Sequence, residues 1–218
     1  MIAEKIDEIK GTIPNHVTLV AVSKTKPNSL IEKAYAGGQR IFGENKVQEL
    51  VDKYEALPKD IEWHMIGHLQ RNKVKYIAPF VSLIHGVDSY KLLKEINKQG
   101  KKCGRKIPVL IQFHIAQESS KFGFTLEEFT ETMEQNSLSE LENIDIQGVM
   151  GMASFTSDQR QVADEFHSLK SIFKSLQKNY FPQNNFKTIS MGMSGDYKIA
   201  IEFGSTMIRV GSTIFGKR

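Results

Sequence analysis

Short hydrophobic runs alternate with longer polar segments along the whole chain. Eight runs have the length of a β-strand, at residues 17–24, 40–45, 62–67, 83–88, 107–115, 144–152, 187–194 and 207–213. Runs of this length and composition predict strands. The segments between them include helix-length amphipathic stretches at residues 29–38, 89–100, 125–138 and 163–180. In the second stretch, Leu92, Leu93 and Ile96 share one helical face, which predicts a helix that packs against the strands.

Repeated strand–helix units predict an α/β fold, with parallel strands inside and helices outside. Eight units in about 200 residues fit a single closed (β/α)₈ barrel of the TIM type, at the small end of its size range. A doubly wound open sheet is the alternative, because periodicity alone does not prove closure. No Gly-, Pro- or Ser-rich linker divides the chain, so we expect one domain over residues 1–218.

The composition is that of a globular protein and gives no sign of nucleic-acid binding or membrane insertion. The 218 residues are 40% hydrophobic and 25% charged, as in ordinary globular proteins. The net charge of +4 is mild, and no basic block is long enough to indicate nucleic-acid binding. The single cysteine, Cys103, excludes an internal disulfide. No signal-peptide core is present, and no apolar run approaches the roughly 20 residues that span a bilayer, so we expect a cytoplasmic protein without membrane contact.

The candidate chemistry lies where strands end, since barrel enzymes carry their reactive residues there. Two glycine- and hydroxyl-rich turns, "SMGMSGD" (190–196) and "RVGSTIFG" (209–216), follow the last two runs. Turns at these positions commonly bind phosphate through backbone N–H groups. The structural alternative is that their glycines only permit tight turns.

Lys24 ends the first run, on the same face as Val20 and Val22. A closed barrel would place it beside the last strand, which carries Arg209. A desolvated lysine next to another cation has a lowered pKa and suits a Schiff base with a phosphorylated aldehyde. The alternative is a strand-end lysine that reaches to solvent. The histidines lack the spacing and carboxylate company of a metal site, so no metal is expected.

Several motifs carry a resemblance to a known family. "AVSKTKP", "FGENKVQE", "WHMIGHLQRNK", "KFGF", "GVMGMAS" and "SMGMSGDYKIAIEFGSTMIRVGSTIFG" occur in this order from about residue 17 to the end. They resemble the YggS/PROSC family of pyridoxal phosphate (PLP) homeostasis proteins. The resemblance implies the fold-type III barrel of the alanine racemase N-terminal domain, without that enzyme's C-terminal β-domain.

The resemblance also implies which residues bind the cofactor. Lys24 would hold PLP covalently as an aldimine, rather than Lys26 two positions later. Arg209 would face the pyridine nitrogen. The remaining cofactor-binding residues would be Asn45 and His64 near the ring, Met193 packed beside it, and Ser194, Gly195, Gly211, Ser212 and Thr213 around the phosphate.

An arginine at the pyridine nitrogen bears on function. It is always charged and cannot accept the pyridinium proton, so the ring is a weaker electron sink. Racemisation also needs an acid–base group on each face of the substrate, and the strand ends show no evident second one. We therefore expect a PLP carrier for buffering and delivery, with PLP-dependent apoenzymes as partners and an effect on amino-acid and keto-acid balance. The alternative is a fold-type III racemase or lyase, and a class I aldolase-like barrel is a weaker third reading. The resemblance also implies a monomer.

Overall fold

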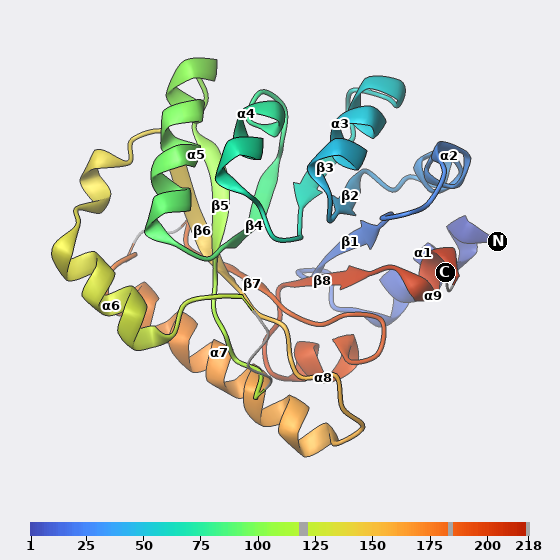
Figure 1. Cartoon of the computed structure of the whole chain (residues 1–218). Helices are drawn as coiled ribbons and strands as arrows, with labels where there is room; N and C mark the ends of the chain where they lie inside the picture. The colour runs from blue at the N-terminus through green and yellow to red at the C-terminus, as the bar shows by residue number, and fades with distance from the viewer. Residues whose placement is uncertain (118–121, 183–184, 217–218) are drawn as a thin grey trace.

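The computed structural model describes residues 1–117, 122–182 and 185–216. Eight parallel strands form a closed barrel in chain order, and the last strand pairs with the first (Figure 1). The strands are β1 (Thr18–Val22), β2 (Ile41–Glu44), β3 (Glu62–Met65), β4 (Leu83–Val87), β5 (Ile107–Gln112), β6 (Ile144–Met150), β7 (Thr188–Ser190) and β8 (Met207–Val210). Each strand lies within a predicted run. Because β8 pairs with β1, the predicted closed barrel is confirmed and the open sheet is excluded.

Helices surround the barrel. They are α1 (Ile2–Thr12), α2 (Asn28–Ala36), α3 (Val47–Ala56), α4 (Val74–Ile77), α5 (Tyr90–Cys103), α6 (Leu126–Gln135), α7 (Gln159–Asn179), α8 (Tyr197–Glu202) and α9 (Ser212–Phe215). The four predicted helical stretches correspond to α2, α5, α6 and α7. The first and last helices, α1 and α9, lie close together (Figure 1). Among the described residues, no helix is both long and apolar enough to cross a membrane.

The helix α3 was not predicted, although Val47, Leu50, Val51 and Tyr54 recur at helical spacing. Its inner face buries Leu50 together with a lysine, Lys53. Only the tertiary partners of Lys53, described below, make its burial possible.

Strand alternation separates two apolar cores. Val20, Leu83, Leu110, Met150 and Met207 fill part of the barrel interior. A larger core between strands and helices takes the opposite face, including Leu19 and Ala21 of β1. In the pairing of β1 with β8, Val20 lies opposite Arg209, so both belong to the inward-facing set. By the same alternation, Val22 and Lys24 follow Val20 on the inward face, toward the carboxyl ends of the strands.

Candidate functional site

A cavity of about 360 Å³ opens at the carboxyl ends of the strands. This volume lies within the usual range of small-molecule sites. Residues that follow β1, β2, β3, β6, β7 and β8 surround it. The lining consists of Val22, Lys24, Asn45, Ile66, Met152, Phe155, Met193, Ser194, Gly195, Asp196, Arg209, Gly211 and Ser212.

The cavity brings together all but two of the residues predicted to bind a cofactor. The exceptions are Thr213, which is exposed on α9, and His64, which is buried deeper in the barrel. The prediction did not include Val22, Ile66, Met152, Phe155 or Asp196. Val22 could have been found, because it alternates with Lys24 along one strand face. Asp196 could have been found as well, because it directly follows the predicted Gly195 in the turn after β7. Ile66, Met152 and Phe155 follow other strands, and only closure of the barrel gathers them.

Arg209 lies at the floor of the cavity, with only 4% of its surface exposed. Its guanidinium donates hydrogen bonds to Ser190 Oγ at 2.6 Å and to the Gly151 carbonyl at 3.2 Å. Burial lowers its pKa to about 10, although the charge of Asp196 acts in the opposite direction. The group therefore stays charged at neutral pH. Its two hydrogen bonds go to neutral oxygens, which leaves other N–H donors to face the cavity.

Two buried histidines continue this hydrogen-bonded chain away from the cavity. His85 Nδ1 lies 3.0 Å from Ser190 Oγ, and His85 Nε2 lies 3.0 Å from His64 Nδ1. Burial lowers the pKa of His64 to about 3 and that of His85 well below its ordinary value, so both rings are neutral at pH 7. Because Ser190 accepts from Arg209, its own hydrogen can be donated to His85, and His85 can donate to His64. His64 thus acts on Arg209 through this chain.

The turns after β7 and β8 present backbone N–H groups to the cavity. Ser194 Oγ accepts a hydrogen bond from Gly211 N at 3.2 Å, which joins the two turns. Asp196 accepts from the N–H of Met193 and thereby closes its own turn. In the described chain, the N–H groups of Ser194, Gly195 and Ser212 have no intramolecular acceptor. Unpaired N–H groups of this kind favour an anion.

The two lysines after β1 have different surroundings. Lys24 is half-buried and lines the cavity that contains Arg209. Lys26 is absent from that lining, and its ammonium donates to the Gly216 carbonyl at 3.0 Å. The structure therefore places Lys24, and not Lys26, against the cavity beside Arg209.

The chemistry of this lining fits a flat heteroaromatic ligand that carries a phosphate group. Val22, Ile66 and Met152 provide apolar walls. Asn45 Oδ1 is buried without a hydrogen-bond partner among the described residues, so it can accept from a ligand hydroxyl. No group of three or more potential metal-ligating side chains is found in the described part of the chain.

Comparisons with known proteins match the whole chain. The family model of the alanine racemase N-terminal domain matches residues 1–218. A pyridoxal phosphate homeostasis protein of Vibrio alginolyticus is 40% identical, covering 98% of this chain and 92% of the relative.

Solved structures of other proteins have the same barrel fold as this chain. The structure of PipY of Synechococcus elongatus with PLP bound has a TM-score of 0.90 and 34% identity, covering 99% of this chain and all of PipY. An alanine racemase from E. faecalis shares the fold at a TM-score of 0.75 and 16% identity, and the match covers 58% of that longer chain.

Proposed function

Because the chain belongs to the alanine racemase N-terminal domain family, and within it to the pyridoxal phosphate homeostasis proteins, we propose that it binds PLP in this cavity and serves PLP homeostasis. The observation that carries the proposal is one cavity that combines a lysine amine, a buried arginine and two turns with open N–H groups. Its relatives carry the PLP homeostasis name, and PipY has been solved with PLP bound.

Different residues of the cavity would bind different parts of the cofactor. The N–H groups of Ser194, Gly195 and Ser212, with the Ser194 hydroxyl, are placed to bind the phosphate. Arg209 can donate a hydrogen bond to the pyridine nitrogen. Asn45 can accept from the ring hydroxyl. Gly211 lies next to Ser212 in the turn after β8. A Cβ at this position would meet the Val22 carbonyl oxygen at 3.1 Å, so glycine allows the end of β8 to pack closely against β1.

Lys24 gives the site its covalent function. Bound PLP supplies an aldehyde that condenses with amines and a ring that withdraws electrons. With PLP bound, the Lys24 amine would hold the aldehyde carbon through a covalent bond formed with loss of water. Such a bond is reversible, which suits a protein that buffers PLP and delivers it to PLP-dependent apoenzymes. We also propose that residues 1–218 act as one domain, because pairing of β8 with β1 joins the two halves of the chain.

The test is to load the protein with PLP, reduce it with borohydride and map the labelled peptide. We expect label on Lys24 and loss of the yellow covalent form in Lys24→Ala. Lys26→Ala is the matched control and should keep the label, because Lys26 does not line the cavity that contains Lys24 and Arg209. Label on Lys26 alone, or on no lysine, would contradict the proposal.

A further inference from the structure

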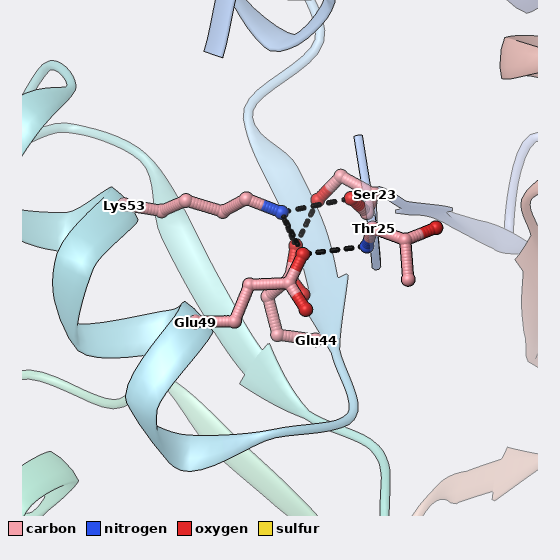
Figure 2. A network of polar contacts seen from close by, with 5 residues as sticks. All are labelled: Ser23, Thr25, Glu44, Glu49 and Lys53. Carbon is pink, nitrogen blue, oxygen red and sulfur yellow. Dashed lines mark hydrogen bonds and ion pairs between the residues drawn. The ribbon is translucent and has the colours of Figure 1, made fainter. Parts of the chain in front are cut away.

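A buried ion cluster lies behind the turn that carries Lys24. Figure 2 shows Lys53 extending from α3 so that its ammonium lies between Ser23 and two glutamates. Its nitrogen donates to Ser23 O at 2.8 Å, to Glu44 Oε1 at 2.7 Å and to Glu49 Oε1 at 2.7 Å. These three bonds use all the donors of an ammonium group. The cluster thus joins β2 and α3 to the end of β1.

The cluster holds the backbone on both sides of Lys24. Before it, the Ser23 carbonyl accepts from Lys53, and the Ser23 hydroxyl donates to Glu44 at 2.6 Å. After it, the N–H of Thr25 donates to Glu49 Oε1 at 2.5 Å (Figure 2). Glu49 and Lys53 are themselves ion-paired. Both peptide groups that flank Lys24 are therefore tied to the same ion pair.

The turn has a conformation that requires such support. Thr25 has a φ of 64° and is the only non-glycine residue with positive φ in the described chain. This left-handed region is unfavourable for L-residues, and especially so for a β-branched one. The strain is held in place by the Glu49 contact, since that carboxylate accepts from the Thr25 N–H itself.

Stability alone is a weak reason for this cluster. Glu44 is fully buried, and its Oε2 has no hydrogen-bond partner among the described residues. Burial raises the pKa of this carboxyl, although hydrogen bonds from Lys53 and Ser23 act against the shift. Desolvating the charges of Glu44 and Lys53 costs free energy that apolar side chains of similar size would not cost. A cluster retained at this cost is better explained by the geometry that it imposes.

We propose that Glu49 and Lys53 are positioning residues that fix the turn at residues 23–25 and so aim Lys24 at the cavity. The inference rests on the proposed function, since it concerns how readily the Lys24 amine meets the PLP aldehyde. Neither side chain belongs to the lining of the cavity that contains Lys24 and Arg209. The cluster therefore acts on covalent capture and leaves the phosphate site unchanged.

The experiment separates these two contributions with a pair of ligands. PLP reports phosphate binding plus the covalent bond, whereas pyridoxine phosphate has an alcohol in place of the aldehyde and reports the non-covalent part alone. In Glu49→Ala we expect PLP affinity to fall about ten-fold, as for loss of a charge-assisted hydrogen bond. Affinity for pyridoxine phosphate should stay within about two-fold of the parent.

Two further variants serve as controls. Glu49→Gln keeps an oxygen that can accept from Thr25, and should recover PLP affinity to within about three-fold of the parent, because a neutral hydrogen bond is weaker than a charged one. Glu55→Ala makes the same truncation at an exposed position of α3 and should change neither affinity. Unchanged PLP affinity in Glu49→Ala, or an equal loss for both ligands, would overturn the inference.

Amide hydrogen exchange of the cofactor-free protein keeps the inference separate from the proposed function. The peptide containing residues 23–26 should exchange faster in Glu49→Ala than in the parent or in Glu55→Ala. Equal exchange in all three would overturn the anchoring role, whatever the ligand results. A parent protein that captures no PLP would overturn the proposed function instead, and exchange would still decide whether Glu49 anchors the turn.

Discussion

Ser194 connects the two turns that we assign to the phosphate. Its hydroxyl oxygen accepts from the N–H of Gly211, so the hydroxyl hydrogen remains available for a phosphate oxygen. The side chain thus has two roles at once, because it orders the turn after β7 against that after β8 and adds a donor to the site. Both roles depend on a single oxygen atom.

Replacing Ser194 with alanine should therefore weaken cofactor retention without unfolding the barrel. The loss of a hydrogen bond to a charged group costs about 1.5–3 kcal/mol, which corresponds to roughly a ten- to hundred-fold loss of PLP affinity. Titration of the cofactor-free protein with PLP measures this change. Ser171→Ala, at an exposed position of α7, is the control and should bind as the parent does. Equal affinities of Ser194→Ala and the parent would mean that the phosphate is held elsewhere.

At the scale of elements, one hydrogen-bonded chain crosses the barrel interior. It runs from Arg209 of β8 through Ser190 of β7 and His85 of β4 to His64 of β3. Both rings must stay neutral for the chain to hold. The interior therefore links the cofactor site to the protonation state of two histidines.

This link predicts a dependence of stability on pH. The pKa of His64 is about 3 in the folded protein because of burial, and about 6.5 in the unfolded chain. The unfolded state thus binds more protons between these values, and stability is lost as the pH falls below 6.5. At pH 5.5 the contribution lost from His64 is about 1.4 kcal/mol relative to neutral pH.

Urea unfolding of the parent and of His64→Gln, at pH 7.5 and 5.5, measures this contribution. The free energy of unfolding should fall by about 1.4 kcal/mol less in His64→Gln than in the parent. His16→Gln, at an exposed position before β1, should follow the parent. The same pH dependence in parent and His64→Gln would show that His64 is not held neutral by burial.

At the scale of the whole molecule, closure of the barrel decides which acid–base groups meet at the cavity. The titratable side chains in its described lining are Lys24, Asp196 and Arg209. Asp196 accepts from the backbone of its own turn, and Arg209 remains charged. His64, His68 and Tyr197 lie in or shortly after strands, but they do not belong to this lining. Lys24 could remove a proton on one face, and among the described lining residues no further neutral acid–base group stands ready to return it on the other face.

We therefore expect no substantial racemase activity. Racemisation requires proton transfer on both faces of the α-carbon. Arg209, in the role that we propose for it at the ring nitrogen, would also weaken the electron sink. The measurement is optical inversion of L-alanine by the PLP-loaded protein, with an alanine racemase run in parallel as the positive control. Turnover in the typical enzyme range of about 1–1000 per second would make the chain a minimal racemase and contradict the carrier role.

Local patterns in the sequence determined the order and type of most elements. Every strand lies within a predicted hydrophobic run, because strands of a closed parallel barrel are buried and their apolar residues are local to each run. The motifs at the strand ends also determined the family, which the comparisons confirmed. The spacing of Val47, Leu50, Val51 and Tyr54 also indicates the helix α3, which was not predicted. The burial of Lys53 on that helix could not be predicted, because its partners lie on other elements.

Only the tertiary structure decided how the site is assembled. The sequence indicated Lys24 by its place after a strand, but Lys26 lies only two positions later. What separates them is a contact of Lys26 with Gly216, at the opposite end of the chain, and the ion cluster that holds the turn around Lys24. In the same way, Met152 and Phe155 reach the cavity from the segment after β6. Contacts between residues so distant in sequence exist only once β8 has paired with β1, and no local pattern encodes them.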